Sequence, residues 1–183
     1  MEEEEQVREL LIRYYSNLFA SSNPTQFDQV LNGVKPRVSS SMNEELLRPF
    51  EVSKVQFALK QMDSDTAPSS DGFPPMFYKK FWSKVGHDIS EAVLAVLNFG
   101  TIPNDLNHTF LTLIPKIHSP RRVIDFRPIS LSNVLHKLVA KVLANRLKPL
   151  LPKLISEKQS AFMSERLIID NILIAHETLY YLR

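Results

Sequence analysis

Apolar side chains recur at spacings of three and four near the start of the chain, which is the periodicity of one face of an α-helix. The pattern predicts a helix over residues 2–20, with apolar positions Val7, Leu10, Leu11, Tyr14, Tyr15, Leu18 and Phe19. Four consecutive glutamates at its start suit the positive end of the helix dipole. Residues 21–42 hold two prolines, a glycine and three consecutive serines, so we expect them to be mostly irregular.

The helical periodicity returns further along the chain. It predicts helices over residues 52–62, 76–82, 87–99, 133–148 and from 165 to the end. Gly100 stands where a helix C-terminus favours glycine, and Ser132 or Asn133 can cap the helix that follows. Residues 66–75 combine proline, serine and an Asp-Gly pair, and they predict a loop.

The periodicity changes between residues 108 and 128. Residues 108–115 mix apolar side chains with threonines, which is typical of a half-buried strand, and residues 123–128 resemble a returning strand. The segment 116–122 between them is a basic turn. We therefore expect an α+β fold that is rich in helix and contains a small antiparallel β-hairpin near residues 109–128.

Charge is distributed unevenly along the chain. The 183 residues carry a formal net charge of +2, yet residues 1–70 hold 7 basic and 11 acidic side chains, whereas residues 71–183 hold 15 and 9. Most of the basic excess lies beyond Phe110. An excess of this size can attract a polyanion, but it also suits a solvated basic face, so charge alone leaves both interpretations open.

The composition and the motif spacing give no support to several classes of functional site. Cysteine is absent, which excludes disulfides, Cys-ligated metals and thiol nucleophiles. The four glycines lack the spacing of a phosphate-binding loop, the five histidines lack metal-ligand spacing, and no Gly-x-Ser-x-Gly occurs. No apolar run approaches the length of a membrane span, and the N-terminus is acidic, so we expect neither a membrane helix nor a secretory signal.

Lys116 and Arg127 have a specific candidate role. They stand at the ends of the two strands of the expected hairpin. A guanidinium binds phosphate oxygens through two parallel N–H groups and an ammonium supplies a mobile point charge, so the pair could hold a triphosphate. The same residues also describe an exposed basic hairpin with no ligand.

Five short motifs fall in one order along the chain. Together they resemble the N-terminal part of the reverse transcriptase of plant LINE-type (non-LTR) retrotransposons, most firmly from about Val52 onward. The motifs are Ala67-Pro68-Ser69-Ser70-Asp71-Gly72-Phe73-Pro74, Leu113-Ile114-Pro115-Lys116, Asp125-Phe126-Arg127-Pro128-Ile129-Ser130-Leu131, Leu143-Ala144-Asn145-Arg146-Leu147 and Gln159-Ser160-Ala161-Phe162.

The resemblance implies a right-hand polymerase that copies RNA into DNA, of which this chain would form the fingers and the first edge of the palm. It implies that Lys116 and Arg127 bind the triphosphate of the incoming deoxynucleotide. Asp71 and Gly72 would lie near the template entry, and the residues along the template would be Gln159, Ser160, Phe162 and Arg166. The implied partners are an RNA template, a DNA primer, a deoxynucleoside triphosphate, and the palm and thumb of the same polymerase.

Some features depart from the family pattern. Family members carry Gly at the position of Ser69 and Pro-Gly at Ser164-Glu165, so these loops should differ locally, and Glu165 should weaken nucleic-acid contact beside Arg166. The family's metal-binding aspartates have no counterpart here, and the chain has no Asp-Asp pair. The resemblance implies Mg²⁺ for the full-length family enzyme, and in-line nucleotidyl transfer needs at least two carboxylates to hold the metals. We therefore expect no catalytic residue, metal site or bound cofactor in this chain, and no activity from it alone.

From the resemblance we expect residues 1–50 to form a helical leader and residues 51–183 to form an incomplete N-terminal part of the reverse transcriptase domain, truncated before the catalytic aspartates. Two alternatives stay open. One is a non-enzymatic module that binds nucleic acid or protein through its basic helices. The other is a non-functional transposon remnant, in which the apolar faces of the helices at 133–148 and 165–182 lack part of their covering. The resemblance leaves open whether the protein acts in the nucleus or the cytoplasm.

Overall fold

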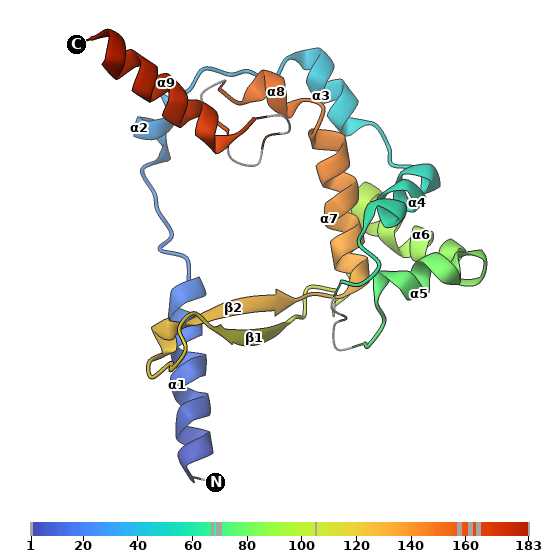
Figure 1. The fold of residues 1–183 in the computed structure, drawn as a ribbon. Coiled ribbons are helices and arrows are strands. Elements are labelled where there is room, and N and C mark those ends of the chain that lie inside the picture. The colour runs from blue at the N-terminus through green and yellow to red at the C-terminus, as the bar shows by residue number, and fades with distance from the viewer. Residues whose placement is uncertain are drawn as a thin grey trace. The chain divides into compact units, whose positions relative to one another are not determined.

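The computed structural model describes residues 2–66, 68, 71–104, 106–156, 159–160, 163 and 166–182 (Figure 1). By packing, the chain divides into two compact units. Unit 1 comprises Met1–Lys35 and Thr109–Ser132, and unit 2 comprises Pro36–His108 and Asn133–Arg183. The boundary expected at residue 50 concerns membership of the polymerase domain rather than packing, so it stays a prediction.

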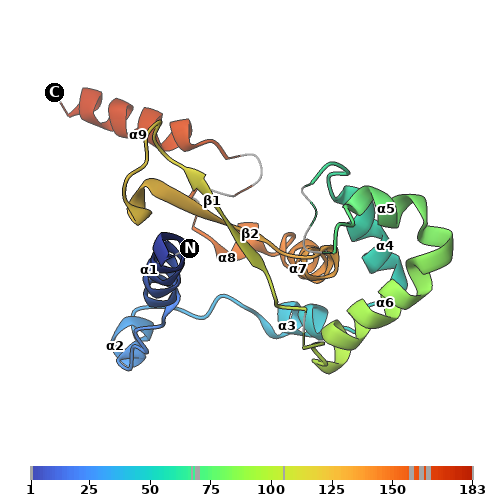
Figure 2. The same ribbon diagram turned by 90° about the horizontal axis from the view of Figure 1, so that it is seen from below.

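Unit 1 joins N-terminal helices to the hairpin. Helix α1 spans Glu2–Phe19, which confirms the helix predicted over residues 2–20, and the short helix α2 spans Phe27–Leu31. Tyr15 is buried, with its ring edge-on to Tyr14 at 5.2 Å and stacked on Phe19 at 6.1 Å between centroids. In both views α1 lies beside the closed end of the hairpin (Figure 1 and Figure 2).

The hairpin consists of strands β1 (Phe110–Pro115) and β2 (Phe126–Leu131), paired antiparallel. It confirms the small antiparallel element predicted near residues 109–128 and makes the fold α+β. The returning strand begins later than predicted, because a 3₁₀ turn, η1 (Val123–Asp125), precedes it. The carboxylate of Asp125 accepts the backbone N–H groups of Arg121 and Arg122 and thereby holds this turn closed.

Unit 2 is helical, and eight buried side chains from four helices form its core. Helix α4 packs against α5, α6 and α7, and α6 also packs against α5 and α7. The helices of this unit are α3 (Ser40–Leu47), α4 (Val52–Gln61), α5 (Pro75–Lys80), α6 (Trp82–Phe99), α7 (Val134–Leu147), α8 (Leu151–Leu154) and α9 (Ile168–Tyr181). The core residues are Val55, Ala58, Leu59, Tyr78, Val93, Val134, Leu138 and Val142.

The region 21–42 is mostly irregular, as predicted, although it also contains the short helix α2 and the start of α3, which the Ser39 hydroxyl caps by accepting the N–H of Met42 at 3.3 Å. One expectation about a helix start was wrong. Helix α6 begins at Trp82 and not at His87. Gly86 lies inside this helix, where the indole of Trp82 covers it so closely that a Cβ there would come within 2.6 Å of the ring.

Other helix boundaries agree with the predictions. Helix α6 ends at Gly100, which adopts a left-handed conformation with a φ of 70° that few other residues accept. Asn133 caps α7 by accepting the N–H of His136 at 2.8 Å. On α7 the apolar stripe is buried at Leu138 and Val142 but exposed at Leu143.

Helix α9 exposes apolar side chains on several of its faces. The exposed residues at its start and along it are Leu167, Ile169, Ile172, Leu173, Ile174, Leu179, Tyr180 and Tyr181. Within the described part of the chain, no helix combines the length and the apolar character that crossing a bilayer requires.

Candidate nucleotide-binding site

The hairpin places Lys116 and Arg127 on one face. Arg127 lies directly opposite Ile114 across the strands. The N–H of Lys116 donates to the carbonyl of Asp125 at 2.7 Å, which extends the ladder by one step beyond β1. Directly opposed residues share a face and faces alternate along a strand, so Ile114, Lys116 and Arg127 all project from the same side of the hairpin.

The two cations differ in the hydrogen bonds that they make within the protein. The ammonium of Lys116 donates to the carbonyl of Ile124 at 2.8 Å, which ties it to its own turn. The guanidinium of Arg127 is exposed, and it makes no hydrogen bond or ion pair with any residue that the structure describes. Arg127 therefore offers all of its donors to a ligand, whereas Lys116 must release one contact first.

Asp125 organises the turn that carries these residues. Its side chain is buried, and it accepts N–H groups from Arg121 at 3.1 Å and Arg122 at 2.9 Å while pairing with the Arg122 guanidinium at 3.3 Å. The two backbone N–H groups, and secondarily the Arg122 guanidinium, lower the pKa of Asp125 below 3.8. Sequence reasoning placed Asp125 in a motif but did not find this role.

The pKa of Asp125 predicts how the turn responds to acid. Because the folded pKa is lowered, ionised Asp125 stabilises the turn at and above its ordinary pKa, and this contribution disappears as the pH falls through the lower folded value. We expect the amide proton shifts of Arg121 and Arg122, followed by NMR, to titrate together with a midpoint below 3.8. Asp125→Asn should abolish that titration. A midpoint at or above the ordinary value would contradict the assignment.

The residues expected near the template entry shape a local turn. The Asp71 carboxylate accepts the N–H of Phe73 at 3.2 Å, and Gly72 has a φ of 72°, a conformation that suits glycine. Burial raises the pKa of Tyr78, and the charge of Asp71 raises it further. Both Asp71 and Gly72 are exposed at the surface of unit 2.

The residues expected along the template belong to a second segment of unit 2. The Arg166 guanidinium donates to the carbonyls of Ser156 at 2.7 Å and Gln159 at 2.9 Å. Ser160 is buried and its hydroxyl accepts the side-chain N–H of Asn171 at 3.1 Å. Gln159 is exposed. Arg166 and Ser160 thus hold this segment together.

The structure does not join all the predicted site residues. Phe162 lies outside the described residues. Within the described ranges, no hydrogen bond or ion pair links Asp71 or Gly72 to Gln159, Ser160 or Arg166. Lys116 and Arg127 belong to the other unit. The hairpin is therefore the candidate site whose geometry is defined.

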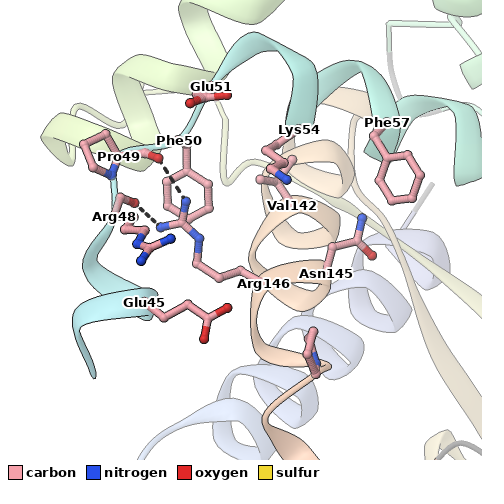
Figure 3. A pocket seen from close by; sticks show the side chains of 11 residues that line it. Glu45, Arg48, Pro49, Phe50, Glu51, Lys54, Phe57, Val142, Asn145 and Arg146 are labelled. Atoms are coloured by element: carbon pink, nitrogen blue, oxygen red, sulfur yellow. Dashed lines mark hydrogen bonds between the residues drawn. The ribbon is translucent and has the colours of Figure 1, made fainter. Parts of the chain in front are cut away.

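Arg146 has a structural role that sequence reasoning missed. In unit 2 its guanidinium lies over the Phe50 ring, 3.1 Å from the centroid, and donates to the carbonyls of Pro49 at 3.2 Å and Arg48 (Figure 3). It also donates to the carbonyl of Leu46 at 2.9 Å. Burial lowers the pKa of Arg146. The side chain of Asn98 pairs with both backbone groups of Phe50, at 2.8 and 3.1 Å. We call this arrangement of Arg146 on Phe50 and the three carbonyls the Arg146 clamp.

The described residues do not form a site for the Mg²⁺ that the resemblance implies. Across the described ranges, no three His, Asp or Glu side chains lie close enough together to hold a metal ion. The carboxylate of Asp125 is already occupied by backbone N–H groups. The carboxylates and imidazoles of the described residues therefore do not fit Mg²⁺, and no described residue is assigned as a metal ligand.

No family model matches the chain. The chain is similar to the uncharacterized 149 kDa protein of transposon TX1 from Xenopus laevis, with 29% identity over 185 aligned residues. The alignment covers 100% of this chain and 14% of that protein, so the chain spans a small part of the length of this relative. The similarity supports a transposon-derived origin.

Proposed function

We propose that the chain is the fingers region of an RNA-directed DNA polymerase of a LINE-type retrotransposon, which binds nucleotide and template and is inactive alone. The observation that carries the proposal is Arg127, an exposed guanidinium without a partner among the described residues, on the same hairpin face as Lys116. The relationship to a transposon protein and the ordered series of motifs support the same interpretation.

The geometry suits the binding of a triphosphate. A guanidinium can donate two parallel hydrogen bonds to phosphate oxygens, and Lys116 can add its charge after releasing the carbonyl of Ile124. Between residues 109 and 132 the basic residues are Lys116, Arg121, Arg122 and Arg127. The one acid of this segment is Asp125, and it is paired with Arg122. This local excess of positive charge favours a polyanion over a neutral ligand.

The proposal assigns binding, and not bond formation, to this chain. Its own residues would hold the phosphates and keep the nucleotide oriented on the hairpin. The carboxylates that nucleotidyl transfer requires would come from other parts of the polymerase. A non-enzymatic nucleic-acid module and a non-functional remnant are the alternatives that the following test separates from it.

The hairpin is tested by titrating a fluorescent deoxynucleoside triphosphate into the purified chain. Arg127→Ala should weaken binding by about 10-fold or more, because a charge-assisted hydrogen-bond pair is lost. The affinity of Arg127→Lys should fall between those of the unaltered chain and of Arg127→Ala, since lysine keeps the charge without the paired donors. Arg13→Ala is the matched control, because it removes the same charge from an exposed site on α1 of the same unit.

Equal affinities of Arg127→Ala and Arg13→Ala for the triphosphate would overturn the triphosphate site.

A primer-extension assay with Mg²⁺ or Mn²⁺ tests the proposed inactivity of the chain alone. We expect no template-dependent synthesis from the 183-residue chain. Synthesis by this chain would contradict the proposal that it is inactive alone.

A further inference from the structure

The closed end of the hairpin carries a Ser-Pro pair that the proposed triphosphate site does not use. In the 183 residues Ser119 is the one serine that precedes a proline, and no threonine does. The third residue after this serine is Arg122, which is basic. A serine followed directly by proline, with a base two positions beyond the proline, is the pattern that proline-directed serine kinases phosphorylate.

Each part of this pattern has a physical reason. Proline has no backbone N–H, so a kinase pocket can take up Pro120 without burying an unpaired donor. Proline also moves the residue before it away from helical backbone, and a kinase cleft binds its substrate in an extended form. The guanidinium of Arg122 can pair with an acidic group on the kinase through two parallel hydrogen bonds.

The closed end of the hairpin is accessible to such an enzyme. Ser119 is exposed, although α1 lies beside this end in both views (Figure 1 and Figure 2). Residues 117–120 make no hydrogen bond with any residue that the structure describes. Arg122 pairs with Asp125 but leaves 77% of its side chain exposed. A kinase can therefore straighten residues 117–120 without breaking a hydrogen bond, while Asp125 keeps the base of the turn closed.

We infer that Ser119 is a phosphorylation site of a proline-directed serine kinase and that its phosphate weakens triphosphate binding by the hairpin. The Ser119 hydroxyl oxygen attacks the γ-phosphorus of ATP and forms the new P–O bond. The bond from this phosphorus to the bridging oxygen breaks, ADP leaves, and the hydroxyl proton passes to a carboxylate of the kinase. The effect on binding rests on the proposed function, whereas the phosphorylation does not.

Phosphorylation changes the charge that attracts a triphosphate. Residues 109–132 carry four basic side chains and one acidic side chain, a net charge of +3. A phosphoserine adds about −1.5 to −2 at neutral pH and supplies three strong acceptor oxygens. The exposed guanidinium of Arg121 stands two positions from Ser119, and it has no partner among the described residues. The phosphate on Ser119 therefore competes with the phosphates of a ligand for the cations of this segment.

The modification is tested by incubating the full purified chain with a cyclin-dependent kinase and radiolabelled ATP. We expect a single phosphate on each chain, mapped to Ser119 by mass spectrometry. Ser119→Ala should lose the incorporation, and Pro120→Ala should lose most of it although the hydroxyl remains. Ser130→Ala is the matched control and should keep it, since Ser130 is exposed on β2 of the same unit and precedes a leucine.

Two outcomes of this assay would overturn the modification site. One is equal incorporation into Ser119→Ala and Ser130→Ala, and the other is no incorporation into the unaltered chain. Circular dichroism of each variant verifies that its helices are intact, so that a loss of incorporation reports on recognition by the kinase.

The effect on the hairpin is tested by titrating the fluorescent deoxynucleoside triphosphate into the phosphorylated chain, freed of kinase and ATP. Phosphorylation should weaken binding by about 5-fold or more, which is the lower end of the usual coupling between two sites. Treatment with a phosphatase should restore the affinity, and kinase-treated Ser119→Ala should bind as the untreated chain does. Equal affinities of the phosphorylated and unmodified chains would overturn the effect of the phosphate.

The two assays also separate this inference from the proposed function. If the unmodified chain binds no triphosphate, the proposed function fails and the effect of the phosphate on binding fails with it. Incorporation at Ser119 is measured without any triphosphate bound to the hairpin, so that result supports or overturns the modification site by itself.

Discussion

Arg146→Ala is expected to lower the free energy of unfolding of unit 2 by about 3 kcal/mol. The substitution takes the charged donor away from three backbone carbonyls and removes the cation from the face of Phe50. A hydrogen bond to a charged group contributes about 1.5–3 kcal/mol and a cation–π contact about 0.5–2 kcal/mol, and partial exposure reduces the sum. Trp82 is the single tryptophan and lies in unit 2, so its fluorescence in a urea titration measures this loss.

Two further variants define the origin of the effect. Arg146→Lys keeps the charge but cannot span the carbonyls of Leu46 and Pro49 together, so we expect it to recover less than half of the loss. Lys148→Ala removes an exposed cation just beyond the same helix and should change stability by no more than about 0.5 kcal/mol. A loss in Arg146→Ala no larger than that in Lys148→Ala would refute the clamp.

The clamp also shows what the sequence could have revealed. Arg146 follows Leu138 and Val142 at successive intervals of four, so it continues the buried stripe of α7 with a cation. That signal was available, and it indicates a buried or partly buried charge with a partner. The identity of the partner was not available, because the carbonyls of Leu46 and Arg48 lie 100 and 98 positions away in the sequence.

Local patterns explain which elements were predictable. Helix α1, the Asn133 cap, the Gly100 terminus and the hairpin each depend on residues close in sequence, and the structure confirms them. Helix α2 and the start of α3 lie within the region that is otherwise irregular as predicted, and they are too short to give a helical pattern of their own. The start of α6 was missed because Gly86 resembles a helix breaker, although it accommodates the Trp82 ring.

The candidate site also has one part that the sequence makes predictable and one part that it does not. That Lys116 and Arg127 share a face follows from the strand register, which a hairpin pattern makes predictable. That Lys116 contacts the carbonyl of Ile124 while Arg127 stays without a described partner depends on the 3₁₀ turn that Asp125 closes. Periodicity could not show this turn, because it arises from one buried carboxylate and two backbone N–H groups.

Helix α7 offers a second large effect with a matched control on the same helix. Leu138 and Leu143 both belong to the apolar stripe that the sequence predicts, yet Leu138 is 0% exposed in the core and Leu143 is 48% exposed. Leu138→Ala should lower the free energy of unfolding of unit 2 by about 3–4 kcal/mol, because it removes buried methyl groups and leaves a cavity between α7 and its neighbours. Leu143→Ala should lower it by less than about 1 kcal/mol, since half of its side chain already faces solvent. Both values come from urea titrations followed by Trp82 fluorescence. Losses of equal size would mean that Leu143 is covered in solution, and they would contradict its exposed position on α7.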